Sequence, residues 1–496
     1  MLVMFKSFNL SYCFYIGIFL FLSYIRFYGL TLDSVTWDEA TYMIAGRYIT
    51  EGLIPYKDFL ELKPPLTFFI YSIPSFIDQN SFIIFRIFGY LFLFLTAIIL
   101  FRILIKNQNH KISFYLVLLF VSIMNYHFWL CNTTELISLP FLLLSYIFYK
   151  DKKFFSSGLM ISFATLIRIN FSVLVLALVS EIIFRIYKKN YNIKDLIRFG
   201  IGGLLPLLLF IIYFFMNDAI LDFKISNFDI FIAYSGENTF YEGFYNFFKA
   251  IFKLNYFYYY VFLPFTFLII ISFFENNKIN TLLSIYIFSI SISIIVSGHS
   301  YSHHFIQLIP FLIIYLSTKN FSNSNFLLSS KKIILYLSIF ISFTISTVDN
   351  INLIIKNKNI SEYHLYNRVI NLIKDQDRPI TLLALDYPII DWKLNPKRIT
   401  KIIHTPSIFR NTTDKRLLPY IENNIFEQNY IDSLFELRPD IIICSVRICE
   451  EDRKNYKSEK IKKLISNYKE IYREKDVSRW EYTQTGTIIV YKLDSY

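Results

Sequence analysis

Residues 82–101 read FIIFRIFGYLFLFLTAIILF and contain one charged side chain, Arg86. A helix of about 20 apolar residues is long enough to cross the roughly 30 Å hydrocarbon core of a lipid bilayer. Similar apolar runs recur up to about residue 348, and 54% of the 496 residues are hydrophobic. A soluble chain of this length needs more charged surface than these runs leave. The sequence therefore predicts a polytopic α-helical membrane protein.

The formal net charge of +12 is distributed as a membrane topology requires, so we expect no nucleic-acid partner. Basic residues gather in short loops between apolar runs, and such loops lie on the cytoplasmic side. The loops 31–80 and 217–255 are richer in acidic residues, so we expect them outside. The basic residues are Lys150, Lys152, Lys153, Arg185, Lys188, Lys189, Lys194, Arg198, Lys331 and Lys332.

Alternation between the two sides of the membrane predicts about eleven transmembrane helices. The apolar stretch of residues 8–30 is long for a signal peptide and lacks a small-residue cleavage site, so we expect an uncleaved first span. Further spans are predicted near residues 82–101, 112–130, 136–149, 199–216, 256–274, 281–297, 305–317 and 333–348.

Segment 156–184 has basic loops on both sides, and a single span would place one of those loops outside. Two short half-helices that turn near Arg168 and Asn170 keep both loops inside. An arginine inside a membrane is costly unless it lines a protected polar cavity. Arg168 is therefore either such a residue or one that snorkels from a helix end, and the periodicity does not distinguish the two.

The composition changes after Asp349, which divides the chain into residues 1–348 and residues 349–496. The second part is polar, with β-rich runs at 380–385, 440–446 and 487–493 and a helical pattern at 458–472. This alternation predicts a soluble α/β domain, which the topology places outside the membrane. Its two cysteines, Cys444 and Cys449, either form a disulfide or stay unpaired. No zinc-finger or nucleotide-binding motif occurs.

The loop at 31–80 contains TWDEATY, residues 36–42, with two adjacent carboxylates. Thr36 and Glu39 fit a capping box, and Gly52 is placed to end a helix over residues 38–50. We expect this helix to lie along the membrane surface. Asp38 and Glu39 then either cap the helix or carry chemistry, and both roles can coexist.

The second half of the loop, PYKDFLELKPPL, brings Asp58, Glu61 and Lys63 up to a Pro-Pro pair. The residue before a proline is pushed toward an extended conformation. Lys63 is therefore expected to expose its ammonium, either for chemistry or for contact with lipid headgroups.

At these residues the loop resembles the GT-C class of membrane glycosyltransferases. Within that class it is similar to the dolichyl-phosphate-mannose protein mannosyltransferase-like (ArnT-like) group, glycosyltransferase family 39. The family pattern places Asp-Glu after the first span, followed by an aromatic residue, a G-x-x-P-Y-x-D run and a K-P-P-L turn. This sequence has, in the same order, Asp38-Glu39, Tyr42, Gly52 to Asp58 and Lys63 to Leu66.

The resemblance extends over the whole chain. Residues 131–148 resemble the second outer loop of the family, with Glu135 opening the next span, and residues 158–178 resemble its segment with a basic turn, here Arg168. Residues 298–312, GHSYSHHFIQLIPFL, are similar to a late family motif. Bacterial members also end in a soluble domain with a strand like RPDIIICSV.

The resemblance implies transfer of a sugar, with inversion, from a polyprenyl-phosphate donor to a cell-envelope acceptor, which is a glycolipid, polysaccharide or protein. Asp38 is expected to be the catalytic base, with Glu39 and Glu135 orienting the acceptor or tuning Asp38. Lys63, and after it Arg168, is expected to stabilise the leaving phosphate. The expected substrate-binding residues are Tyr42, Asp58, Glu61, Lys63, Arg168, His299, His303, His304 and Gln307.

One departure bears on the sugar. Thr41 stands where the aminoarabinose transferases of this group have an arginine, three residues after the Asp, and this argues against that sugar. The spacing of the histidines alone does not make a metal site, so no metal ligand and no cofactor is assigned. Some members of the class bind a divalent metal, which leaves such an ion open.

The expected partners are the polyprenyl-phosphate sugar, membrane lipids and the envelope acceptor. The expected location is the bacterial inner membrane, with many spans and an extracytoplasmic C-terminal domain. A lipid-linked glycan flippase or transporter is the alternative, although the chain lacks the internal repeats that are typical of transporters. A catalytically silent relative is a further alternative, against which the intact Asp38, Glu39 and Lys63 argue.

Overall fold

The fold is that of a computed structural model. It describes residues 2–31, 37–124, 132–229, 240–257, 262–273, 280–296, 301–319, 326–356, 362–374, 380–385, 387–397, 400–403, 436–450, 456–475 and 487–493.

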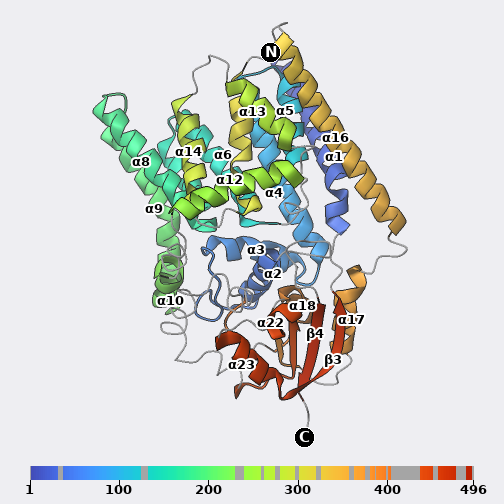
Figure 1. The fold of residues 1–496 in the computed structure, drawn as a ribbon. Helices are drawn as coiled ribbons and strands as arrows, with labels where there is room; N and C mark the ends of the chain where they lie inside the picture. The colour runs from blue at the N-terminus through green and yellow to red at the C-terminus, as the bar shows by residue number, and fades with distance from the viewer. Residues whose placement is uncertain are drawn as a thin grey trace. The chain divides into compact units, whose positions relative to one another are not determined.

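The chain forms two compact units whose segments alternate along the sequence (Figure 1). The first unit comprises Met1–Thr31, Arg86–Ile211 and Asn238–Ile355, and it is a bundle of helices. The second comprises Leu32–Phe85, Ile212–Glu237 and Lys356–Tyr496. The loop after the first helix therefore belongs to the same unit as the C-terminal segment. The predicted division at residues 348 and 349 concerns placement about the membrane and stays a prediction.

Apolar helices lie at most of the predicted spans. Four segments in the described part of the chain are long and apolar enough to cross a membrane: Phe82–Leu104, Ile169–Tyr187, Ile193–Met216 and Lys331–Val348. The chain is accordingly a multi-pass membrane protein, and the number of about eleven crossings stays a prediction. The helices are α1 (Leu2–Thr31), α4 (Phe82–Leu104), α5 (His110–Ile123), α6 (Thr134–Lys150), α7 (Phe154–Ile167), α8 (Ser172–Tyr187), α9 (Ile193–Met216), α13 (Phe262–Phe273), α14 (Thr281–Val296), α15 (Ile309–Ser317) and α16 (Phe326–Lys356).

The segment predicted to turn near Arg168 is interrupted at that residue. Arg168 is extended, with φ −142° and ψ 108°, and a 3₁₀ turn, η2 (Ile169–Phe171), leads into α8. The two basic loops meet at one end of the bundle, because the ring of Phe154 lies 5.0 Å from that of Tyr191 and Lys152 lies over the same tyrosine. The helices α7 and α8 have 14 and 16 residues, so they are longer than the half-helices predicted.

The outer loop predicted at 217–255 contains helices that the sequence analysis does not predict. They are α10 (Ile220–Lys224), a π-helical turn η3 (Ile225–Asp229) and α12 (Phe240–Phe257). The last two residues of α12 fall inside the span predicted to begin at residue 256, and α13 begins only at Phe262.

Helices α2 (Trp37–Thr50) and α3 (Leu66–Ile77) pack closely in the second unit. A Cβ at Gly46 would lie 2.4 Å from the backbone oxygen of Tyr71, so only glycine allows this approach. Residues 39–47 are all buried. Protein therefore covers the middle of this helix, and its placement along the membrane surface stays a prediction.

The predicted end of this helix is confirmed. Gly52 has a φ of 83°, in the left-handed region that favours glycine, and the Leu53 N–H donates a hydrogen bond to the Tyr48 carbonyl. This is the Schellman arrangement, which satisfies the last carbonyls of a helix. Thr36 lies outside the described residues, so the capping box at the other end stays a prediction.

The C-terminal segment contains a four-stranded sheet in the order β1-β2-β4-β3. Strand β1 (Leu382–Ala384) pairs in parallel with β2 (Ile441–Ser445), and β4 (Thr487–Leu493) runs antiparallel to β2 and to β3 (Tyr468–Lys475). The helices of this segment are α17 (Glu362–Lys374), α18 (Pro388–Leu394), α22 (Val446–Cys449) and α23 (Tyr456–Ile465).

Strands β1, β2 and β4 lie at the three predicted β-rich runs, and the helix predicted at 458–472 is only partly correct. Helix α23 ends at Ile465, and residues from Tyr468 onward form β3. Pairing with β4, a contact between residues far apart in the sequence, here outweighs the local helical pattern. Cys444 and Cys449 form a disulfide.

Two sets of hydrogen bonds join the first loop to the C-terminal segment. Leu60 pairs with the backbone around Ile402: its N–H donates to the Lys401 carbonyl at 2.7 Å, and its own carbonyl accepts from the Ile403 N–H at 3.3 Å. Arg47, buried on α2, donates to the Trp392 carbonyl at 2.6 Å. The first loop, residues 31–80, is thus held by α18 and by residues 401–403.

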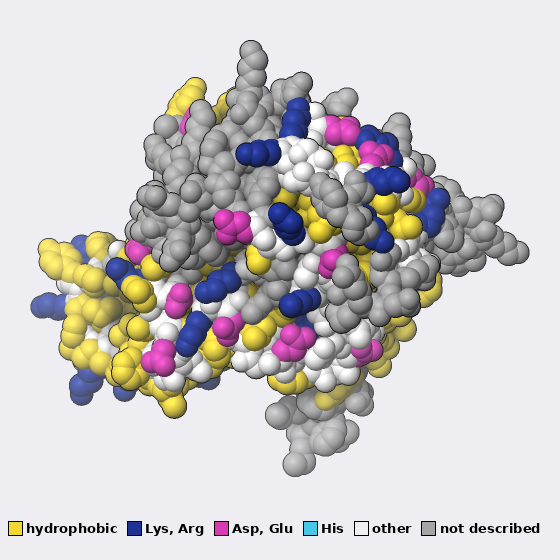
Figure 2. Space-filling view, turned by 90° about the horizontal axis from the view of Figure 1, so that it is seen from below, with side chains coloured by type: hydrophobic (Ala, Val, Ile, Leu, Met, Phe, Trp, Pro, Cys, Tyr) yellow, Lys and Arg dark blue, Asp and Glu magenta, His cyan; other side chains and the backbone are white. Residues whose placement is uncertain are grey.

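In Figure 2, apolar side chains gather at the left edge of the surface, where α8 and α9 project in Figure 1. Large side chains exposed on these helices include Leu176, Ile183, Ile201 and Leu208. Exposed apolar faces of this kind are what a lipid-facing helix requires.

We expect Gly46→Ala to destabilise the protein by about 1–3 kcal/mol, because the new methyl group forces α2 away from α3. Gly200→Ala in α9 is the matched control, since a Cβ there meets nothing within 4 Å. Both changes gain helix propensity, so their difference isolates the steric effect. Thermal unfolding of the detergent-solubilised protein measures it. Equal melting temperatures for the two variants would contradict the close approach of α2 and α3.

A second expectation concerns Asp391 of α18. Burial raises the pKa of Asp391 to about 6, and the nearby Arg47 guanidinium lowers it by less. The folded state therefore holds a proton that the unfolded state, at its ordinary pKa of 3.8, has already released. This contribution to stability is lost as the pH rises toward 6 and stays lost above it. Asp391→Asn should therefore raise the melting temperature more at pH 7.5 than at pH 5. An equal gain at both pH values would contradict the raised pKa.

Candidate functional site

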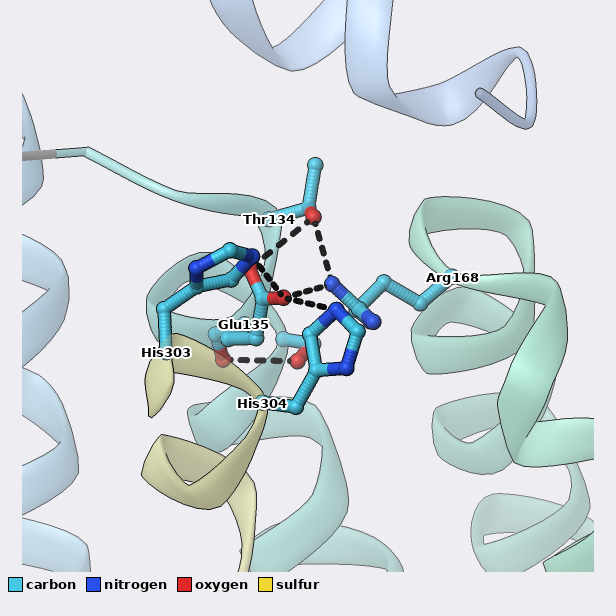
Figure 3. A network of polar contacts seen from close by, with 6 residues as sticks. Thr134, Glu135, Arg168, His303 and His304 are labelled. Carbon is cyan, nitrogen blue, oxygen red and sulfur yellow. Dashed lines mark hydrogen bonds and ion pairs between the residues drawn. The ribbon is translucent and has the colours of Figure 1, made fainter. Parts of the chain in front are cut away.

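The first unit brings together a polar cluster of five side chains, which are buried except for the partly buried His303 (Figure 3). The carboxylate of Glu135 forms an ion pair with Arg168, and its Oε1 lies 3.6 Å from His303 Nε2 and 3.8 Å from His304 Nε2. The Thr134 hydroxyl accepts a hydrogen bond from Arg168 Nη1 at 3.2 Å. Glu135, Arg168, His303 and His304 are all predicted site residues, so the fold assembles three of them around the carboxylate of the fourth.

Three elements position this cluster. Thr134 and Glu135 begin α6, Arg168 is the residue after the end of α7, and both histidines lie in a 3₁₀ turn, η4 (Ser302–Gln307). Helices α6 and α7 run antiparallel, so the start of one lies beside the end of the other. At their other end Ser157 donates a hydrogen bond to the Ser145 carbonyl at 3.0 Å.

The electrostatics of the cluster follow from burial. Glu135 and Arg168 are both buried, and a buried charge costs several kcal/mol unless it is paired. Arg168 is therefore a charge held inside the bundle and not one that snorkels from a helix end, which answers the question left open by periodicity. Its Nε has no hydrogen-bond partner among the described residues, so part of the guanidinium is still available to a ligand.

A carboxylate oxygen with two imidazole nitrogens is a donor set found at zinc sites. The ligand atoms of Glu135, His303 and His304 lie within 4.8 Å of one another. Two ligands of a tetrahedral zinc ion, each at about 2.0–2.2 Å, are separated by roughly 3.4 Å, close to the distances from Glu135 to each histidine. These three residues fit a divalent cation, which the histidine spacing alone does not indicate, because Glu135 is distant in the sequence.

The second unit holds the residues of the first loop. Asp38 and Glu39 occupy the first turn of α2, where the helix dipole favours negative charge. Glu39 is 0% exposed, whereas Asp38 is only partly buried. Of the two adjacent carboxylates, Asp38 is therefore the one that a substrate can reach.

Lys63 lies beside this helix turn. Its Nζ is 5.9 Å from the centre of the Tyr42 ring, and Tyr42 is in turn packed against Tyr71 at 5.1 Å. Tyr42 follows Asp38 by four residues, one turn along α2. Lys63 is partly buried, and its ammonium has no carboxylate or hydrogen-bond partner among the residues that the structure describes. Binding of a phosphate by Lys63 stays a prediction.

Tyr56 is a residue of this loop for which the sequence analysis assigns no role. Its hydroxyl donates to the Lys63 carbonyl at 2.7 Å, and burial raises the pKa of Tyr56 well above its usual value, so it remains a donor. Its backbone has a φ of 68°, which is uncommon outside glycine. Rings of Phe68 and Phe214 pack around it at 5.7 and 5.5 Å. Tyr56 thus holds the main chain of Lys63, and no local sequence signal reveals this bond.

Asp58 has a structural explanation in addition to its predicted role. Its carboxylate accepts a hydrogen bond from the Ile54 N–H at 2.7 Å and so closes the turn that contains Tyr56. Glu61 is 5% exposed, next to the backbone pairing of Leu60. Substrate binding by Asp58 and Glu61 stays a prediction.

Two predicted residues remain. Gln307 is 0% exposed, and neither atom of its amide group has a hydrogen-bond partner among the described residues. In a 3₁₀ turn, residues three apart share a face, so Gln307 lies one turn beyond His304. Its unsatisfied amide favours a ligand at this face. His299 lies outside the described residues.

The sequence matches no known family model and no curated protein. The crystal structure of ArnT from Cupriavidus metallidurans bound to undecaprenyl phosphate is similar in structure, with a TM-score of 0.62 and 11% sequence identity. The similarity covers 97% of this chain and 98% of that one. The chain has the ArnT fold.

The predicted GT-C fold is thereby confirmed over nearly the whole chain. An identity of 11% supports no conclusion beyond the fold, so membership of glycosyltransferase family 39 stays a prediction. Within this ArnT fold, the predicted site residues form two groups, one in each compact unit. Asp38, Glu39, Tyr42 and Lys63 belong to the second unit, and the Glu135 cluster belongs to the first.

We expect the purified protein to bind a zinc ion at Glu135, His303 and His304. His304→Asn should lower the zinc content after dialysis by at least tenfold, because it removes one of three ligands. His110→Asn is the matched control, since His110 packs against Phe14 and Phe101 away from the cluster. Elemental analysis by mass spectrometry measures the metal without any activity assay. The same zinc content in wild type and in His304→Asn would exclude this ligand set.

Proposed function

We propose that this protein transfers a sugar from a polyprenyl-phosphate carrier to a cell-envelope acceptor, with inversion at the sugar. Lys63 carries the proposal, as a lysine without a carboxylate partner among the described residues, held over Tyr42 one helix turn from Asp38. The ArnT fold supports it, because the solved ArnT structure contains undecaprenyl phosphate. A cation and a reachable carboxylate are the two groups that this reaction requires.

The proposed reaction assigns one residue to the leaving group and one to the acceptor. The bond between the sugar C1 and the phosphate oxygen breaks, and its electron pair leaves with the polyprenyl phosphate. Lys63 stabilises the negative charge that accumulates on that phosphate. An acceptor hydroxyl forms the new bond to C1 from the opposite face, and its proton passes to Asp38. A single displacement of this kind inverts the configuration at C1.

The other site residues have supporting roles in the proposal. Glu39, which is buried on the same helix turn as Asp38, orients it. Arg168 is the second candidate for the phosphate, and its pairing with Glu135 makes it a weaker one, because part of its charge is already neutralised. Glu135 therefore acts by holding Arg168 and the histidines. A divalent ion bound there would add positive charge next to Arg168.

The test uses membranes that contain wild type, Asp38→Asn or Lys63→Gln, supplied with a radiolabelled undecaprenyl-phosphate sugar. We expect Asp38→Asn to lower transfer of label to envelope acceptors by roughly 10²–10⁴-fold through loss of the base. Lys63→Gln should lower it by about 10²–10³-fold through loss of the charge on the leaving group. Glu51→Gln is the matched control, since Glu51 is an exposed acid just beyond the end of α2.

The outcomes separate the alternatives. Equal transfer by wild type and Asp38→Asn would show that Asp38 is not the base. Movement of the carrier between leaflets, with no transfer by any variant, would favour a lipid-linked glycan flippase. The sugar and the acceptor are then identified from the labelled product of the wild-type protein.

A further inference from the structure

Helix α12 divides its residues into three sectors. Gly243, Phe247, Ala250 and Leu254 recur at helical spacing and are buried against the bundle. A second sector is aromatic and exposed. It comprises Tyr241, Phe244, Tyr245, Phe248 and Phe252, with 46–78% of each residue exposed.

The third sector of α12 is charged. Glu242, Lys249 and Lys253 are exposed and share one side of the helix, since they follow one another at intervals of seven and four residues. The Lys249 ammonium lies 5.6 Å from the centre of the Tyr245 ring, at the border of the aromatic and charged sectors. A helix of an ordinary water-exposed surface needs only two sectors, one apolar and buried and one polar.

The direction of α12 differs from that of its neighbours. In Figure 1, α12 lies crosswise to α13 and α14 within the same unit. Large apolar side chains are exposed on both of those helices, among them Phe267, Phe273 and Phe288. The aromatic sector of α12 thus accompanies a lipid-facing surface, whereas its axis does not follow the spanning direction.

We propose that α12 is an in-plane helix bound at the boundary between the headgroups and the acyl chains of the bilayer. Its aromatic sector enters the acyl region and its charged sector contacts headgroups and water. Aromatic rings and lysines are the side chains that concentrate at this boundary. The exposed sector includes Tyr241 and Tyr245, and tyrosine concentrates at the interface, whereas Leu and Ile prevail on α9.

This placement has a consequence for the polar cluster. On the buried side of α12, the ring of Phe247 packs against Phe305 at 5.1 Å, and Phe305 follows His304 directly in η4. A helix fixed at the interface therefore holds η4, with both histidines, at headgroup depth. That is the depth at which the phosphate of a membrane lipid lies.

Spin-label accessibility tests the proposal without any activity assay. Single cysteines replace Phe248, Phe252, Glu242 or Lys249 in a background with Cys13→Ala and Cys131→Ala and with the Cys444–Cys449 disulfide retained. All four positions are exposed, so the label fits without disturbing the bundle. The full chain is reconstituted in phosphatidylethanolamine–phosphatidylglycerol vesicles. Collision rates are measured with oxygen, which concentrates among acyl chains, and with a water-soluble nickel chelate.

The expected result is a ratio of oxygen to nickel collisions at least tenfold higher at 248 and 252 than at 242 and 249. High nickel accessibility at all four positions would place α12 in water and overturn the proposal. Low accessibility to both reagents at 248 and 252 would show that protein covers the aromatic sector, and this also overturns it. Size-exclusion profiles like that of the parent protein confirm that each labelled variant is folded.

Discussion

The pairing of Arg168 with Glu135 is the constraint on which the helix bundle depends. A charge among apolar helices is costly unless it is neutralised, and each of these residues sits at a helix end where the other can meet it. Because Glu135 begins α6 and Arg168 follows α7, the pair requires the two helices to run antiparallel. The return of the chain at Arg168 then keeps both basic loops at one end, which the charge distribution also requires. The same carboxylate lies within 3.8 Å of His303 and His304 of η4.

The second unit also contains a buried arginine whose charge needs polar partners. Arg47 is buried within α2, and it donates to backbone carbonyls of Trp392 and, at 3.2 Å, Gln79 instead of to a carboxylate. Its guanidinium also lies 5.5 Å from the Trp392 ring. These contacts fix the far end of the helix whose first turn carries Asp38. The first loop is thus folded as a part of the C-terminal segment, so the residues proposed for catalysis depend on a segment that follows the last apolar helix.

Hydropathy and charge predict most of the first unit, because lipid contact and topology act on each helix separately. The turn at Arg168 follows from two basic loops alone. Helix α12 is not predicted, since its charged residues interrupt the apolar run that a span requires and its acidic loop indicates only the outer side of the membrane. Strand β3 is not predicted either, because its local pattern is helical and only its pairing with β4 makes it a strand. The contacts of Glu135 with His303 and of Tyr56 with Lys63 are likewise products of packing, and no local pattern encodes them.

The interaction partner of a cation determines how much positive charge the cation can offer to a phosphate. A carboxylate partner, as Arg168 has in Glu135, neutralises much of the charge that a leaving phosphate would use. An aromatic partner, as Lys63 has in Tyr42, attracts the ammonium by its ring quadrupole and leaves the net charge intact. The main-chain bond from Tyr56 then fixes the lysine without adding a negative group. In a glycosyl transfer with oxocarbenium character, bond breaking precedes proton removal, so the leaving group demands the stronger stabilisation. Lys63 therefore has the electrostatic surroundings that this reaction favours, and Arg168 has those of a structural ion pair.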